Sequence, residues 1–360
     1  MNQNQIKIGD RLIGEGQPCY IVAEISADHN QSFENAKKII HAAKKAGADA
    51  VKLQTYTPET MTLDCEGEDF QIPSDSVWSG KKLFELYAEA YTPWEWHPKL
   101  QKLAHDCGLD FFSTPFDETA VDFLQDLKIP VFKVASFEIV DLPLLKKIAS
   151  TGKPVIVSTG MSSLAEIEEA VATLKNEGTK DIALLKCTSA YPALPSGVNL
   201  LTIPYLSKSY NIPIGLSDHT LGGHVAIAAV TLGANIVEKH FILSRTDGGP
   251  DSSFSMEPDE FSHMVTAIRD VEQALGGVSF EPNSDEQKSL CFRRSLFVVQ
   301  DIHLGEQMTL ENVRSIRPGY GLAPKFLDQV LGKRANKPVQ KGTPLSWDLV
   351  DGGGGGNISD

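Results

Sequence analysis

The sequence is 360 residues long, 41% hydrophobic and 22% charged, which is typical of a globular chain with enough length for a large core. Its formal net charge is −14, from 47 acidic and 33 basic residues. An acidic surface repels phosphate backbones, so we exclude nucleic acid as a partner. An anionic metabolite would need a local cluster of basic residues that acts against this overall field.

Targeting signals and cysteine usage predict a cytoplasmic protein. The first ten residues, MNQNQIKIGD, are polar and lack the apolar centre of a secretory signal. No stretch reaches the roughly 18–20 continuous apolar residues of a membrane span, so no membrane partner is expected. The five cysteines are odd in number, lie far apart and form no CxxC pair, which favours reduced thiols. We assign none of them a nucleophilic role.

Short β-branched runs alternate with longer amphipathic segments, the pattern of βα units and a parallel sheet. The predicted strands are 20–25, 50–55, 109–114, 131–136, 154–159, 182–189, 212–217 and 235–241. Helical periodicity lies between the strands and is clearest at 32–48, 164–178 and 258–277. Eight strands, each followed by a helix, predict an α/β fold of the (β/α)₈ TIM-barrel type. A doubly wound sheet is the competitor, but its Gly-rich first turn is missing.

The pattern changes after about residue 278, and we divide the chain accordingly. Residues 1–278 form the predicted barrel domain, 279–290 a polar linker, 291–350 a small β-rich domain and 351–360 a disordered Gly-rich tail. Within the barrel domain, residues 56–91 separate the second strand from its helix. A connection of this length is more often a functional lid or binding loop than a passive connector.

Polar residues stand at the carboxyl ends of nearly all the predicted strands, where the chemistry of an α/β barrel takes place. They are Glu24, Lys52, Gln54, Thr114, Lys133, Ser136, Ser158, Ser189, Tyr191, Ser217, Asp218, His219, Glu238 and His240. A lysine inside a barrel costs several kcal/mol unless it is paired, so the set needs a shared explanation. Two lysines with converging hydroxyls suit a compact carboxylate or phosphate anion. The alternative is that each lysine pairs with a buried glutamate.

Two histidines end adjacent predicted strands, which would bring His219 and His240 within a few ångströms of each other. A pair of imidazoles with water or substrate oxygens suits Mn²⁺, Fe²⁺, Co²⁺ or Zn²⁺. The alternative is a general base or a hydrogen-bonded structural residue. His29 follows the first predicted strand and could support the site from behind, and the other histidines receive no role.

These strand-end residues lie in motifs that resemble the sialic acid synthase, or NeuB-like, family, which condenses phosphoenolpyruvate with an N-acylated hexosamine. The motifs are AEISADHN (23–30), AVKLQT (50–55), FFSTPFD (111–117), FKVAS (132–136), VSTGM (157–161), CTSAYP (187–192), GLSDHT (215–220), VEKHF (237–241) and GGPD (248–251). RSIRPGYGLAP (314–324) resembles the antifreeze-like (SAF) domain of the same enzymes. The resemblance therefore covers almost the whole chain.

The resemblance implies roles for individual positions. Phosphoenolpyruvate contacts fall on Lys52, Thr114, Lys133, Ser136, Ser158, Ser189, Ser217 and His219, and metal ligands on His219 and His240. Sugar contacts fall on Glu24, Gln54, Tyr191, Asp251 and Arg317. Arg317 matches an arginine that one subunit inserts into its neighbour's barrel, which implies a domain-exchanged homodimer. The implied cofactor is a divalent metal, Mn²⁺ first, with Co²⁺ and Mg²⁺ as alternatives.

Two departures bear on the sugar. Ser189 stands where N-acetylneuraminate synthases typically have asparagine, and SSFS (252–255) stands where they have a histidine-containing stretch. Together with LYAEAYTPWEWH (86–97), these departures resemble the pseudaminic acid synthase branch, whose sugar is 2,4-diacetamido-2,4,6-trideoxy-altropyranose. Phe254, Trp78 and Tyr87 are candidates to line an apolar sugar pocket, and the alternative is that these aromatic residues only pack the lid. N-acetylneuraminate or legionaminate synthesis is the runner-up.

The implied reaction joins C3 of phosphoenolpyruvate to the sugar aldehyde, adds water at C2 and releases phosphate by C–O cleavage. Glu24, Glu238, His219 and His240 are the candidate catalytic groups, and the sequence does not say which glutamate manages protons. A metal-dependent hydrolase would usually show more histidines and a bridging carboxylate. A non-catalytic carbohydrate-binding protein would not need both histidines.

Overall fold

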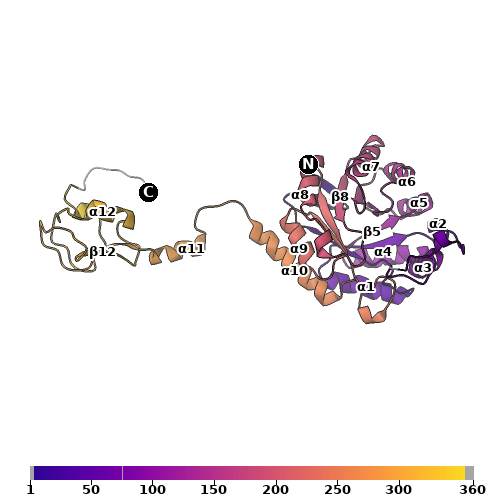
Figure 1. The fold of residues 1–360 in the computed structure, drawn as a ribbon, viewed down its shortest axis with the longest axis horizontal. Coiled ribbons are helices and arrows are strands. Elements are labelled where there is room, and N and C mark those ends of the chain that lie inside the picture. Colours follow the sequence, from indigo (N-terminus) through magenta and orange to yellow (C-terminus); the bar gives the residue numbers. More distant parts are fainter. Residues whose placement is uncertain (1–3, 75, 353–360) are drawn as a thin grey trace. The chain divides into compact units, whose positions relative to one another are not determined.

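A computed structural model describes residues 4–74 and 76–352 of the chain (Figure 1). The chain divides into two compact units, Met1–Gly276 and Gly277–Asp360.

The first unit is built on a closed barrel of parallel strands. The barrel strands are β3 (Tyr20–Glu24), β4 (Ala50–Thr55), β5 (Asp110–Pro115), β6 (Phe132–Val134), β7 (Val155–Ser158), β8 (Ile182–Cys187), β9 (Ile214–Asp218) and β10 (Ile236–His240). They pair in chain order, and β10 closes the barrel against β3 with His240 opposite Glu24. The predicted (β/α)₈ barrel is confirmed, and each predicted strand matches an observed one within a few residues at its ends.

One helix after each strand packs around the outside of the barrel (Figure 1). These helices are α1 (Phe33–Lys45), α4 (His97–Asp106), α5 (Glu118–Asp126), α6 (Leu142–Ala149), α7 (Leu164–Asn176), α8 (Thr202–Tyr210), α9 (His224–Thr231) and α10 (Pro258–Leu275). Their beginnings follow ordinary capping chemistry. Ser163 and Glu166, for example, form a reciprocal capping box at the start of α7.

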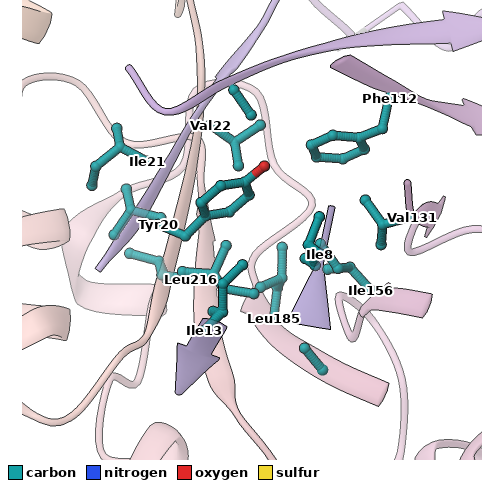
Figure 2. Packing of buried hydrophobic residues seen from close by; sticks show 14 of the residues in the cluster. Ile8, Ile13, Tyr20, Ile21, Val22, Phe112, Val131, Ile156, Leu185 and Leu216 are labelled. Atoms are coloured by element: carbon teal, nitrogen blue, oxygen red, sulfur yellow. The ribbon is translucent and has the colours of Figure 1, made fainter. Parts of the chain in front are cut away.

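A short hairpin before the barrel was not predicted. Strands β1 (Gln5–Ile8) and β2 (Arg11–Gly14) pair antiparallel around a two-residue turn. Figure 2 shows Ile8 and Ile13 of this hairpin among strand side chains that include Ile156, Leu185 and Leu216. The signal was present as alternating apolar residues on both sides of Gly9, whose φ is +57°. The hairpin adds to the apolar core within the strands, while the carboxyl ends of the strands carry the polar residues.

The long connection after β4 is ordered rather than structureless. It contains α2 (Pro58–Met61) and α3 (Leu83–Ala90) before α4 begins. In the part of the chain that the structure describes, no helix is long and apolar enough to cross a membrane.

The second unit has a small core of its own. Its strands β11 (Ser295–Val298) and β12 (Val313–Ile316) pair antiparallel, and α12 (Leu327–Val330) packs beside them. The predicted linker contains a short helix, α11 (Ser284–Ser289), with Asn283 as its N-cap. Of the predicted tail, residues 353–360 lie outside the described residues.

Two histidines that face the helix layer are fully buried. His97, at the start of α4, lies 2.8 Å from the Thr55 hydroxyl through Nε2, and Thr55 in turn lies 2.6 Å from the Ser113 hydroxyl. His29 lies 3.0 Å from the Thr92 hydroxyl and therefore supports the entry to α4, not the polar strand ends. Burial lowers the pKa of each imidazole to about 4.

Acid should therefore destabilise the barrel through His97. An unfolded histidine titrates near about 6.5, so between about pH 6.5 and 4 the unfolded state binds more protons than the folded state. The stabilisation by neutral His97 is complete above this range and is lost as the pH falls through it, by about 3 kcal/mol. We expect His97→Gln to flatten the slope of unfolding free energy against pH in urea titrations. His105→Gln removes an exposed histidine from the same helix and should keep the wild-type slope; an equal slope in both variants would contradict the assignment.

Candidate active site

The carboxyl ends of the barrel strands surround a polar pocket. Its lining residues are Glu24, Lys52, Gln54, Thr114, Phe116, Lys133, Ala135, Ser136, Phe137, Ser158, Cys187, Tyr191, Ser217, His219, Glu238 and His240. Twelve residues of the predicted site are in this lining. Ser189, Asp251 and Arg317 are the predicted residues outside it.

Four charged side chains meet in this pocket, each with a side-chain exposure of 7% or less. Lys52 Nζ lies 2.6 Å from Glu24 and 3.7 Å from Glu238, and Lys133 Nζ lies 3.8 Å from Glu238. Both lysines therefore pair with buried glutamates, which is the alternative that the sequence left open. The pairing does not remove the anion interpretation, because both ammonium groups also contact hydroxyls of the same pocket.

Those hydroxyl contacts come from neighbouring strands. Lys133 donates to Ser158 Oγ at 2.7 Å, and Lys52 donates to Thr114 Oγ1 at 3.2 Å. Ammonium and hydroxyl groups gathered in this way are the donors that carboxylate and phosphate oxygens accept from.

The two glutamates are held differently. Burial would raise the pKa of Glu238, but Lys133, Lys52 and His219 outweigh burial and lower it. Glu238 also accepts a hydrogen bond from Ser217 at 3.2 Å. For Glu24, burial outweighs the opposing contact with Lys52, and its pKa is raised. Glu24 is therefore the carboxylate that takes up a proton more readily.

A backbone amide adds to the cluster of hydroxyls. Gly160 N–H donates to Ser136 Oγ at 3.0 Å. A Cβ atom at residue 160 would lie only 2.2 Å from Ser189 Oγ and 2.7 Å from Ser136 Oγ. A side chain at residue 160 would push both hydroxyls away, so glycine lets the backbone approach the two serines closely. Gly160 lies within the VSTGM motif (157–161), which was the available signal.

The strand-end histidines lie side by side, with ring centroids 5.4 Å apart. Nδ1 of His219 lies 3.1 Å from the Thr188 carbonyl oxygen, which fixes the ring. Nδ1 of His240 is buried without a hydrogen-bond partner and lies 3.7 Å from Asp251 Oδ2. Burial, and then the neighbouring His219, hold the pKa of His240 well below its ordinary value, so its imidazole is neutral.

This arrangement fits a metal held by two protein ligands. Among the described residues, no group of three or more His, Cys, Asp or Glu side chains is placed to hold an ion. Two imidazoles would therefore leave most coordination positions to water or substrate oxygens. Neutral imidazole is the form that binds metal, and His240 already has it. For His219, contacts with Cys187 and the Thr188 carbonyl oxygen outweigh burial and raise the pKa, so a metal would have to displace a proton there.

Asp218 and Lys239 alternate with the pocket-facing residues of β9 and β10, and they form a buried ion pair on the other face of these strands. Lys239 Nζ lies 2.8 Å from Asp218 Oδ2 and donates to the Thr220 carbonyl oxygen at 2.6 Å, with side-chain exposures of 0% and 1% for the pair. Because successive side chains of a strand alternate, this pair ties β9 to β10 directly behind the two histidines. It fixes the spacing of the imidazoles without touching the pocket.

Sequence reasoning missed Cys187. Its Sγ lies 3.9 Å from His219 Nδ1 and 3.7 Å from Ser189 Oγ, inside the pocket wall. Burial would raise the pKa of the thiol, but the contact with His219 outweighs burial and lowers it to about 7. Its position at the end of β8, where every neighbouring strand carries a polar residue, was the available signal.

Aromatic residues cover the histidines. Phe254 packs against His240 with ring centroids 5.0 Å apart, and Tyr191 packs against His219 at 4.5 Å. Trp78 of the long connection reaches Tyr191 at 5.4 Å and donates to the Pro250 carbonyl oxygen at 2.7 Å. Tyr87 packs instead against Tyr56. Trp78 and Phe254 thus join this aromatic group as predicted candidates, and Tyr87 does not.

Arg317 belongs to the second unit, where it is exposed after β12. Its predicted role therefore stays a prediction.

The closed parallel barrel has an ionic pocket at its carboxyl edge, and a separate small β-unit follows it in the chain. These features are typical of a (β/α)₈-barrel enzyme. Residues 39–279 match the family model described as NeuB family, and residues 293–351 match the SAF domain. The chain belongs to the NeuB family.

Individual relatives cover nearly the whole chain. A pseudaminic acid synthase from Helicobacter pylori is 45% identical over 93% of this chain and 98% of its own length. An N,N'-diacetyllegionaminic acid synthase from Legionella pneumophila is 35% identical over 98% of this chain and 100% of its own length. A crystal structure of N-acetylneuraminic acid (sialic acid) synthetase from Leptospira borgpetersenii in complex with citrate is 32% identical, with a TM-score of 0.71 over 80% of this chain and 95% of that chain.

Proposed function

We propose that this chain condenses phosphoenolpyruvate with 2,4-diacetamido-2,4,6-trideoxy-altropyranose and water to give pseudaminic acid and phosphate. The observation that carries the proposal is the convergence of two lysines, several hydroxyls and two histidines in one buried pocket. The higher identity to a pseudaminic acid synthase, 45% against 35% for a legionaminic acid synthase, favours this sugar.

Phosphoenolpyruvate would bind among the basic and hydroxyl groups. Lys133, Ser158 and Ser136 would hold one anionic end, with Ser189 and the Gly160 amide beside them. Lys52, Thr114 and Ser217 would hold the other end. Both glutamates would then lie beside the reacting carbons and balance the charge of the lysines.

A divalent metal held by His219 and His240 would act as a Lewis acid toward the sugar aldehyde oxygen. We infer Mn²⁺, with Co²⁺ or Mg²⁺ as substitutes. C3 of phosphoenolpyruvate forms the new bond to the aldehyde carbon, water adds at C2, and the C–O bond to phosphate breaks. Glu24 is the better proton carrier, because two lysines and Ser217 hold Glu238 in its ionised form.

The aromatic side chains and Asp251 would select the sugar. Gln54 and Tyr191 would offer polar contacts at the side of the pocket that Phe254 and Trp78 close, and Asp251, 3.7 Å from His240, would add one from just outside the lining. A sugar without a 6-hydroxyl group and with a second acetamido group suits this partly apolar wall.

We further infer a domain-exchanged homodimer in which Arg317 of one chain reaches the barrel of the other. Large apolar side chains are exposed on the loops that follow four adjacent barrel strands. They are Phe137, Val140, Met161, Leu194 and Leu221, each more than half exposed. An apolar rim around a polar pocket suits coverage by a second chain. Cytoplasmic location stays a prediction.

Phosphate release from phosphoenolpyruvate should depend on the sugar. With Mn²⁺ present, we expect release with the altrose derivative and at most about 1% of that rate with N-acetylmannosamine. A coupled phosphate assay measures both. Comparable release with N-acetylmannosamine would keep the chemistry and overturn the sugar, and release only with the legionaminate precursor would favour the runner-up.

Loss of one imidazole should abolish metal-dependent turnover while the fold survives. We expect His240→Ala to lower kcat at least about 100-fold and to weaken Mn²⁺ binding, read from the electron paramagnetic resonance signal of free Mn²⁺. Thermal unfolding checks the fold, and His224→Ala, an exposed histidine on α9, is the matched control. Full turnover or unchanged Mn²⁺ binding in His240→Ala would sink the metal assignment.

Two inactive variants should rescue each other if the domains exchange. Arg317→Ala and His240→Ala each disable both sites of their own homodimer, but a mixed dimer contains one barrel with His240 that receives Arg317 from its partner. Random exchange of subunits should restore about a quarter of the wild-type activity. No recovery after verified exchange would mean that Arg317 acts within its own chain, and full activity of Arg317→Ala alone would mean that Arg317 takes no part in the reaction.

A further inference from the structure

Two loops at the carboxyl edge of the barrel meet around Asp251. The loop after β3 provides the Ala27 amide, 3.4 Å from Asp251 Oδ2, and the Ser26 hydroxyl, which also bonds to this carboxylate. Ser26 in turn accepts a hydrogen bond from Gln54 Nε2 at 2.9 Å. Ser26 has a φ of +42°, a strained conformation for a residue with a side chain. The carboxylate of Asp251 is thus held from one side by hydrogen-bond donors.

The backbone of Asp251 is held from the other side by Ser255. Ser255 Oγ lies 2.9 Å from the Asp251 carbonyl oxygen and 2.6 Å from Asp28 Oδ2. A hydroxyl group carries a single proton, so it cannot donate a full hydrogen bond to both oxygens. Two full hydrogen bonds form if Asp28 carries a proton, whereas an ionised Asp28 would have to share the single hydroxyl proton of Ser255 with the Asp251 carbonyl oxygen. In the protonated form, Asp28 donates to Ser255, and Ser255 donates to Asp251.

The surroundings of Asp28 favour its neutral form. Its side chain is buried with 3% residue exposure, and no Lys, Arg or His among the described residues forms an ion pair with it. Its Oδ1 is buried without a hydrogen-bond partner. Burial first, and then the nearby charge of Asp251, raise the pKa of Asp28 well above its ordinary value, and they outweigh the hydrogen bond with Ser255, which acts in the opposite direction. An ionised carboxylate in this position would be desolvated without compensation.

The contacts from Asp28 to Ser255 and from Ser255 to Asp251 form a relay. The loop that this relay holds carries Phe254 and lies over the histidines. Met256 N–H donates to the His240 carbonyl oxygen at 2.9 Å, which returns the loop to β10. Phe254, between Asp251 and Ser255, packs on the rings of His240 and Tyr191. A shift of Ser255 would therefore move both the carboxylate of Asp251 and the ring of Phe254.

We propose that Asp28 is a neutral carboxylic acid that donates to Ser255 and so positions Asp251 and Phe254 for the acetamido sugar. Asp28 is a positioning residue, because its contacts are with Ser255 and not with the pocket. The inference rests on the proposed function for its kinetic consequence, but not for the protonation of Asp28.

Substitutions of Asp28 should distinguish a hydrogen-bond donor at this position from a negative charge. Asparagine keeps a donor group in place of the protonated oxygen, and leucine removes it. We expect Asp28→Asn to keep the KM for the sugar within about threefold, and Asp28→Leu to raise it about tenfold or more. The KM for phosphoenolpyruvate should change less than about twofold in both variants.

Ser255→Ala provides a second route to the same link, with the loss of a single oxygen atom. It should raise the KM for the sugar as Asp28→Leu does, and the double variant should be no worse than the poorer single variant, because both break one relay. Thermal unfolding verifies that each variant folds. Equal defects in Asp28→Asn and Asp28→Leu, parallel changes in both KM values, or additive effects in the double variant would each overturn the proposal.

The protonation itself has a readout that needs no turnover. The infrared difference spectrum between wild type and Asp28→Asn near neutral pH should contain the carbonyl stretch of a neutral carboxylic acid. A carboxylate band in its place would overturn the proposal even in a fully active enzyme. If wild type releases no phosphate with any sugar, the proposed function fails, and the infrared result still decides the state of Asp28.

Discussion

The buried contact of Lys52 and Lys133 with Glu24 and Glu238 is the constraint on which the rest of the site depends. Four charges with almost no exposure are stable only while each keeps a partner, since removal of one partner from such a cluster costs about 3–5 kcal/mol. The barrel supplies the partners from β3, β4, β6 and β10, so the charges can meet only after the barrel has closed. An anionic substrate would use the same cations, which makes a costly cluster useful for binding.

Strand alternation separates the reacting face from its support. On β9 and β10, Ser217 and Glu238 face the pocket, whereas Asp218 and Lys239 form a desolvated pair behind them. The same principle places apolar residues of the strands and of the β1–β2 hairpin in the core, as Figure 2 shows for Ile8 and Ile13. The polar pocket therefore lies at the carboxyl end of the barrel and the apolar core lies below it, so polar and apolar side chains do not compete for the same positions.

Loops at the carboxyl edge of the barrel supply the remaining contacts of the site. Gly160 brings a backbone amide to the serines at the edge of the pocket, and Phe254, Tyr191 and Trp78 close the side over the histidines. The loop that carries Phe254 is held by Ser255 and Asp28, which come from opposite ends of the barrel sequence.

The sequence by itself determined the barrel, its eight strands and most of the pocket. Short β-branched runs between amphipathic segments locate the strands and their ends, and polar residues such as Lys52, Ser217 and His240 stand out there because burial would otherwise penalise them. The tertiary structure alone decided which partner each polar atom meets. The pairing of Lys52 with Glu24, the entry of Cys187 into the pocket and the Asp28–Ser255 contact join residues up to 227 positions apart. No local pattern encodes such distances, because they follow from closure of the barrel and from the path of its loops.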